Sequence, residues 1–207
     1  MDLVRFTHHN KCILCASKRD SHYRIMYWSL HDNNILCSFI GHTDSITTID
    51  LNPQDSSFLS CSKDGTTRVW EYQKKQCLIK INKSKTACFD NMGKLLACLF
   101  VRPNTSAAAM QQMKQNNEQD EAGGSNATGG QSSGQPLDQM IHLFNTENYK
   151  DKPFQTFTIE NETKEIKSMK FSPNGKYVLL GTRENLIMLL DAFKGTMVQR
   201  FEGQFNP

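Results

Sequence analysis

The 207-residue sequence lacks any run of about 18 apolar residues, the length that a membrane-spanning helix needs. Its first residues, MDLVRFTHHNKC, lack the basic stretch and apolar core of a secretory signal. The formal net charge is only +3, so charge alone does not indicate a nucleic-acid-binding protein. We therefore expect a protein that neither spans a membrane nor binds nucleic acid directly.

The sequence also lacks a pattern for disulfides or metal. Its seven cysteines are an odd number, which does not fit a simple disulfide framework. Most lie in apolar segments, as expected for buried free thiols in a reducing compartment. Cys12 and Cys15 have the C-x-x-C spacing, but residues three apart on a strand point to opposite faces, so they would not share a zinc ion. We predict no metal and no cofactor.

The feature that is present is a repeat. Four segments share one layout of four short strand-like runs, separated by turn residues. The turn after the first run reads HHNK, NPQDSS, DNMGK and SPNGK in successive units. Proline fixes φ, glycine accepts positive φ, and Asn and Asp make side-chain turn bonds, so each of these turns has a mechanical reason. The period of about 40 residues is that of a four-stranded propeller blade.

We therefore predict an all-β fold, a partial β-propeller with blades at residues 1–40, 41–81, 82–159 and 160–203. The third blade is interrupted by residues 104–137, which are rich in Gln, Asn, Gly and Ser and poor in large apolar residues. Such a segment cannot bury enough surface to offset its ordering entropy, so we predict that it is disordered.

The second unit contains three short motifs at fixed separations. GHTDS begins at Gly41, SCSKDG at Ser60, and VWE at Val69, with Glu in place of a final Asp. This arrangement resembles the WD-repeat family of β-propellers, in which His, Ser or Thr, Asp and Trp form a hydrogen-bonded chain inside one blade. The resemblance implies a structural network here. Its members would be His42, Asp64, Trp70 and either Ser60 or Ser62.

The same residues include a Ser-His-Asp set, which also invites a hydrolase interpretation. Neither Ser60 nor Ser62 lies in a G-x-S-x-G nucleophile elbow, and both are expected within a strand. A propeller enzyme would gather carboxylates or metal ligands on its innermost strands. Asp50 and Asp90 are the acidic residues in those runs, and they belong to no visible set. We predict a protein that is not an enzyme.

The other units depart from the motif. The position of Trp70 aligns with Ser29 or Leu30 in the first unit, with Phe144 in the third and with Leu190 in the fourth.

Three longer stretches indicate a resemblance to a more specific group of proteins. They are LVRFTH from Leu3, WSLHDN from Trp28 and, above all, DAFKG from Asp191. These stretches resemble the WD-repeat subunits of COMPASS-type histone methyltransferase complexes, which also occur in mRNA 3′-end and nuclear phosphatase complexes. The resemblance implies a ring of about seven blades, so the remaining blades are expected from a longer chain.

The resemblance also implies a function and partners. The protein would be a nuclear scaffold that binds a SET-domain methyltransferase subunit and links it to the phosphorylated tail of RNA polymerase II. An adaptor of an mRNA 3′-end, phosphatase or ubiquitin-ligase complex is the alternative within the same class.

Four cations lie in turns between second and third strands, which emerge on one face of a propeller. They are Lys18, Arg19, Lys63 and Arg183. We consider them a candidate rim for an acidic or phosphorylated peptide. Their acidic neighbours also fit ordinary solvated turns. On the opposite face, Phe193 is either a partner anchor or the packed residue of a tight turn.

Overall fold

The computed structural model describes residues 2–17, 22–103, 137–149, 152–159, 165–183 and 186–203. Within these ranges the chain forms strands β1 to β16 and no helix. None of the described residues forms a helix that could cross a membrane. The predicted disordered insert lies outside the described residues except for Leu137. That residue begins β11 and pairs with Pro103, so the prediction of disorder is wrong there.

Four antiparallel sheets follow one another along the chain. The first contains β1 (Leu3–Phe6), β2 (Cys12–Ala16), β3 (Ile25–Ser29) and β4 (Asn34–Phe39). The second contains β5 (Ile46–Leu51), β6 (Ser57–Ser62), β7 (Thr66–Glu71) and β8 (Gln76–Asn82). The third contains β9 (Ser84–Phe89), β10 (Leu95–Pro103), β11 (Leu137–Asn145) and β12 (Gln155–Ile159). The fourth contains β13 (Ile166–Phe171), β14 (Tyr177–Thr182), β15 (Ile187–Asp191) and β16 (Met197–Phe201).

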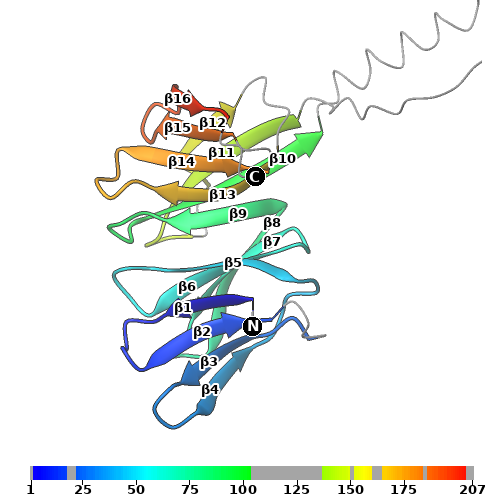
Figure 1. Cartoon of the computed structure of the whole chain (residues 1–207), viewed down its shortest axis with the longest axis vertical. Coiled ribbons are helices and arrows are strands. Elements are labelled where there is room, and N and C mark those ends of the chain that lie inside the picture. Colours follow the sequence, from blue (N-terminus) through cyan, green and yellow to red (C-terminus); the bar gives the residue numbers. More distant parts are fainter. Residues whose placement is uncertain are drawn as a thin grey trace, which may run out of the picture.

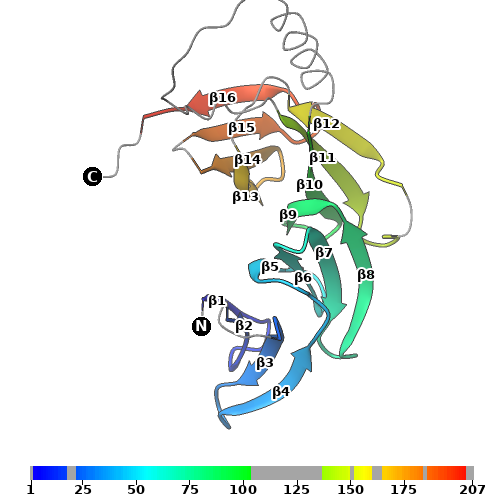
Figure 2. The same ribbon diagram turned by 90° about the vertical axis from the view of Figure 1, so that its right-hand side faces the viewer.

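The sheets stack one after another along the long axis of the molecule (Figure 1). Figure 2 shows that they fan out as an open arc, with β1, β5, β9 and β13 on its concave side. The last strand of each sheet lies on the convex side of the arc. Each sheet is a simple meander in which sequence neighbours are also hydrogen-bonded neighbours. The predicted all-β partial propeller is confirmed.

The apolar core lies between successive sheets. Phe58 and Leu59 are adjacent on β6, and both are fully buried. Because side chains alternate along a strand, Phe58 packs toward the first sheet and Leu59 toward the third. At the first of these boundaries, the rings of Phe39 and Phe58 meet edge to face with centroids 5.0 Å apart. Strands β2 and β6 consist of apolar and small residues, and all of these residues are buried.

The cysteines take part in this packing as free thiols. Five of them are buried: Cys12, Cys15, Cys61, Cys88 and Cys98. Burial raises the pKa of Cys61 to about 12, which disfavours the reactive thiolate. Within the described residues, no group of three or more His, Cys, Asp or Glu side chains could hold a metal ion.

One carboxylate connects three of the innermost strands. Asp50 on β5 is 9% exposed, and its Oδ1 lies 2.5 Å from Nζ of Lys170 on β13. Its Oδ2 accepts a hydrogen bond of 3.1 Å from the backbone N–H of Phe89 on β9. The second, third and fourth sheets therefore meet at Asp50.

We expect Asp50→Ala to lower the free energy of unfolding by about 1–3 kcal/mol, because the buried Phe89 amide loses its acceptor. Asp50→Asn keeps an oxygen acceptor and should cost less, since the lost ion pair involves a lysine side chain that is 58% exposed. Urea unfolding followed by circular dichroism measures both variants. Equal destabilisation by the two substitutions would contradict the role assigned to the carboxylate oxygen.

Candidate functional site

A chain of hydrogen bonds crosses the second sheet. Trp70 on β7 donates from Nε1 to Oγ of Ser60 on β6 at 2.8 Å. Oγ of Ser60 lies 2.7 Å from Nε2 of His42, which precedes β5. Nδ1 of His42 lies 2.9 Å from Oδ2 of Asp64 in the β6–β7 turn. The structure thus brings these four predicted residues together.

The protonation states of the chain follow from its burial. Burial lowers the pKa of His42, against the opposing effect of Asp64, so the imidazole is neutral at pH 7. Nδ1–H then donates to Asp64, and Nε2 accepts the hydroxyl proton of Ser60. Burial by itself would raise the pKa of the Asp64 carboxyl. Hydrogen bonds from Thr66, His42 and the Thr43 amide outweigh burial and lower that pKa to about 2.

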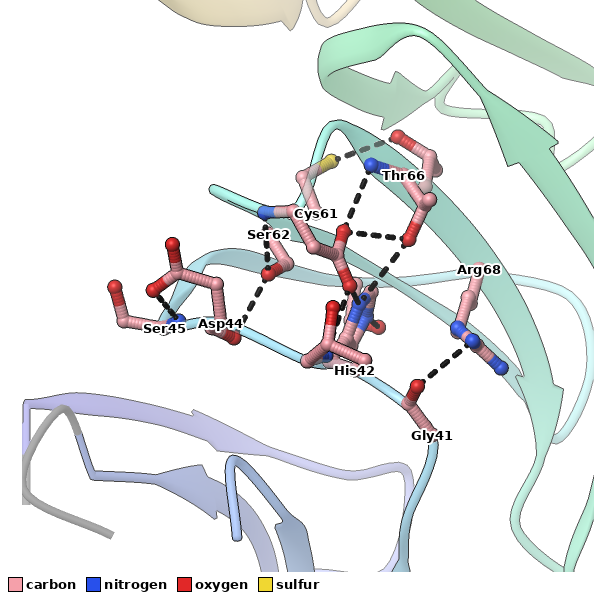
Figure 3. Close-up of polar contacts among 12 residues, drawn as sticks. Gly41, His42, Asp44, Ser45, Cys61, Ser62, Thr66 and Arg68 are labelled. Atoms are coloured by element: carbon pink, nitrogen blue, oxygen red, sulfur yellow. Dashed lines mark hydrogen bonds and ion pairs between the residues drawn. The ribbon is translucent and has the colours of Figure 1, made fainter. Parts of the chain in front are cut away.

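Further contacts hold the loop before β5 against the β6–β7 hairpin, as Figure 3 shows. Arg68 donates from Nη2 to the carbonyl oxygen of Gly41 at 2.8 Å. Ser62 donates from Oγ to the carbonyl oxygen of Asp44 at 2.8 Å. Ser62 therefore stabilises the loop, whereas Ser60 is the serine that connects tryptophan to histidine.

The hydrogen-bonded chain from Trp70 to Asp64 is closed to solvent. Ser60 is fully buried, and Trp70 and His42 are 3% and 5% exposed. The Ser60 hydroxyl accepts one hydrogen bond and donates another, so its oxygen is not directed at any open space where a substrate could bind. This geometry suits a network that fixes the blade rather than a nucleophile.

The residue of the first sheet that corresponds to Trp70 is Trp28, so the predicted alignment with Ser29 or Leu30 is wrong. Three sheets have a register irregularity at the same place, between their third and fourth strands. It falls at Tyr27/Trp28, Val69/Trp70 and Leu189/Leu190.

The first sheet cannot form the same chain. Ile13 pairs with Trp28 as Phe58 pairs with Trp70, so Cys15 occupies the position of Ser60. A thiol is a weak acceptor. Among the described residues, the buried Nε1 of Trp28 has no hydrogen-bond partner.

The predicted cationic rim is described in part, because Lys18 and Arg19 lie outside the described residues. Lys63 and Arg183 are exposed, and their backbone N–H groups donate to the loops before β5 and β13. We call this side of the arc the His42 face. It comprises residues 41–45, 63–65, 83–85, 165–167 and 183.

Around Glu165 on the His42 face the structure places two cations that sequence reasoning missed, Lys85 and Lys167. Lys85 Nζ lies 2.5 Å from Oε1 of Glu165. The hydrogen bond from Lys85 is the largest cause that lowers the pKa of the Glu165 carboxyl. The positive charges of Lys85, Arg183 and Lys167 lower this pKa further, and together these effects outweigh partial burial. Three cations therefore surround one carboxylate and leave an excess of positive charge. Only the pairing of sheets brings these residues together, so no sequence motif could signal them.

The opposite side is called here the Phe193 face, comprising residues 7–11, 52–56, 71–75, 90–94, 145–149, 152–154, 172–176 and 191–196. Phe193 in the β15–β16 turn is 70% exposed, so its ring is not the packed residue of that turn. Two cavities of the described part open on this face. One, of about 540 Å³, lies between His9, Tyr27 and Tyr72; the other, of about 520 Å³, lies beside Phe154.

Comparison with known proteins places the repeat in a family. The model described as "WD domain, G-beta repeat" matches residues 33–71, which include the whole hydrogen-bonded chain. The chain therefore contains WD repeats. A second WD-repeat model, described as "Anaphase-promoting complex subunit 4 WD40 domain", matches residues 141–206.

Several WD-repeat relatives match nearly the whole chain. "WD repeat-containing protein 82" of Drosophila melanogaster is 30% identical over 100% of this chain and 54% of its own length. "Set1 complex component swd2" of Schizosaccharomyces pombe is 27% identical over 96% of this chain and 46% of its own length. "COMPASS component SWD2" of Saccharomyces cerevisiae is 26% identical over 92% of this chain and 48% of its own length. The chain thus spans about half the length of these relatives.

We expect Ser60→Ala and Trp70→Phe to be strongly coupled in stability, because either substitution breaks the same buried bond. Each single change leaves a buried polar group without its partner, at about 1–3 kcal/mol. The double variant should be less unstable than the sum of the two by at least about 0.5 kcal/mol. A double-mutant cycle by urea unfolding measures this coupling. Additive effects would contradict a hydrogen-bonded chain through Ser60.

Proposed function

We propose that this chain acts as a non-catalytic WD-repeat scaffold in a nuclear, COMPASS-type histone H3 lysine methyltransferase complex. The observation that carries the proposal is the alignment with two relatives named as Set1 or COMPASS components, over 96% and 92% of the chain. Alignment over almost the whole chain supports more than a shared repeat, because the WD-repeat model itself covers only residues 33–71. In this role the chain would bind a SET-domain subunit, and methyl transfer would take place on that other chain.

The chemistry of the described residues supports a scaffold. The His-Ser-Asp set of the second sheet is buried and internally bonded. Propellers present rigid loops on two faces, and loops on a rigid scaffold commonly carry recognition. Here the loop before β5 is fixed by bonds from Arg68 and Ser62, so the surface around it is ready for a partner without prior ordering.

We also propose that the His42 face contacts the phosphorylated tail of RNA polymerase II. Lys63 and Arg183 are exposed on this face, and Lys85 and Lys167 add positive charge near the carboxylate of Glu165. Phosphate groups form strong charge-assisted hydrogen bonds with such cations. Lys18 and Arg19 would join the same rim.

An adaptor in an mRNA 3′-end, phosphatase or ubiquitin-ligase complex is the second candidate. The match to the anaphase-promoting complex subunit 4 model favours a different assembly, but it covers only residues 141–206. The COMPASS-named relatives align over 96% and 92% of the chain, and we therefore prefer the methyltransferase scaffold.

We expect the tagged chain to recover a SET-domain histone methyltransferase from nuclear extract, as identified by mass spectrometry. A Lys63→Glu, Arg183→Glu variant should keep the methyltransferase and lose phosphorylated RNA polymerase II, because the reversed charges repel phosphate. Lys75→Glu with Lys176→Glu, on the Phe193 face, is the matched control and should keep both.

Two outcomes count against these proposals. Recovery of ubiquitin-ligase or phosphatase subunits without a methyltransferase would contradict the scaffold role. Undiminished recovery of the polymerase by the Lys63→Glu, Arg183→Glu variant would exclude the His42 face as its binding surface.

A further inference from the structure

The β15–β16 turn presents an aromatic ring to solvent in a fixed position. Oδ1 of Asp191 accepts hydrogen bonds from the backbone N–H groups of Phe193 and Lys194, both at 2.8 Å. Gly195 follows with φ of 68°, and a Cβ at this position would lie 2.0 Å from the Phe157 ring. The turn is therefore clamped against the third sheet, while the Phe193 side chain remains 70% exposed.

A second exposed aromatic ring lies nearby on the third sheet. Phe154, immediately before β12, is 57% exposed. Its neighbour Gln155 donates from Nε2 to the carbonyl oxygen of Phe193 at 3.4 Å, which ties the two segments together. Met92, in the β9–β10 turn of the same face, is 59% exposed. Large apolar side chains rarely gather on a surface without a partner.

The cavity beside Phe154 supplies the polar part of this surface. It measures about 520 Å³ and is lined by Lys94, Leu95, Asn145, Glu147, Lys152 and Phe154. Two of these residues are cationic, and Glu147 is the one carboxylate among the described residues that line it. Lys194, in the β15–β16 turn, is a further exposed cation of the Phe193 face.

We propose that Phe154, Phe193 and the cavity between Lys94 and Lys152 bind a short acidic peptide segment that carries one large apolar side chain. The apolar residue would pack against the two phenylalanine rings, and its acidic neighbours would pair with the lysines. The positive charge of the cavity selects an acidic partner over a basic one. This proposal rests on the scaffold role above and specifies one surface through which a partner is held.

Phe154, Phe193 and the cavity between Lys94 and Lys152 form the proposed binding patch. This patch lies apart from the residues that pack between sheets. Phe193 and Phe154 belong to turns, whereas sheets stack through strand residues such as Leu180 and Ile141. The patch is thus distinct from the core, and substitutions in it should leave the fold intact. It is also distinct from the His42 face, which carries the proposed phosphopeptide rim.

The test begins with a phage library of random short peptides selected on the purified chain. We expect enrichment of peptides in which Asp or Glu flank Trp, Leu or Phe. Fluorescence anisotropy with one enriched peptide should then show at least about a tenfold weaker Kd for Phe193→Ala, as for an aromatic anchor. Lys94→Glu with Lys152→Glu should weaken binding to a similar degree.

Lys63→Glu on the His42 face is the matched control and should bind the peptide like the unmodified chain. Circular dichroism and Tm should be unchanged in all variants, because the substituted side chains are exposed. Selection of basic or uncharged peptides, or enriched peptides that bind Phe193→Ala undiminished, would overturn the proposal. Since the selection uses no nuclear complex, its failure alongside recovery of a methyltransferase would remove this surface and leave the scaffold role standing.

Discussion

Face-to-face packing between neighbouring sheets is the constraint on which the rest of the structure depends. Each sheet is a plain meander with two apolar faces, so no sheet can hide its apolar residues alone. Phe58 and Leu59, adjacent on β6, bury themselves against different neighbours. Where a sheet faces no neighbour within the described residues, apolar residues stay open, as for Phe6, which is 69% exposed on the first sheet. Stability in such an array comes from the boundaries between units.

Polar interactions then fix how the loops leave this stack. The chain from Trp70 to Asp64 holds the loop before β5, and Asp50 joins three innermost strands. With the loops fixed, the two sides of the arc acquire different chemistry. The His42 face is cationic around Glu165, whereas the Phe193 face combines exposed aromatic rings with a lysine-lined cavity. A scaffold with two unlike faces can hold two unlike partners at once.

The sequence predicts the repeat well because turns carry local signals. In SPNGK, for example, Asn174 Oδ1 accepts the Lys176 amide, as a turn-forming Asn should. The sequence predicts side-chain contacts less well where these contacts depend on how strands distant in sequence approach one another. Ser60 and Ser62 are two residues apart on β6 and share one face of the sheet, so only the register of β6 against β7 decides which of them meets Trp70. The equivalence of Trp28 and Trp70 follows only from the strand register, and the pairing of Lys85 with Glu165 depends on the contact between two sheets.

Hydrogen–deuterium exchange on a Phe58→Ala variant tests the central claim most directly. Removing this ring from the boundary of the first and second sheets should cost about 3–5 kcal/mol. We expect amides of β2 and β3 to exchange faster, although no residue of the first sheet is changed, while amides of β14 and β15 are affected least. Acceleration confined to the strands of the second sheet would contradict the claim that neighbouring sheets stabilise one another.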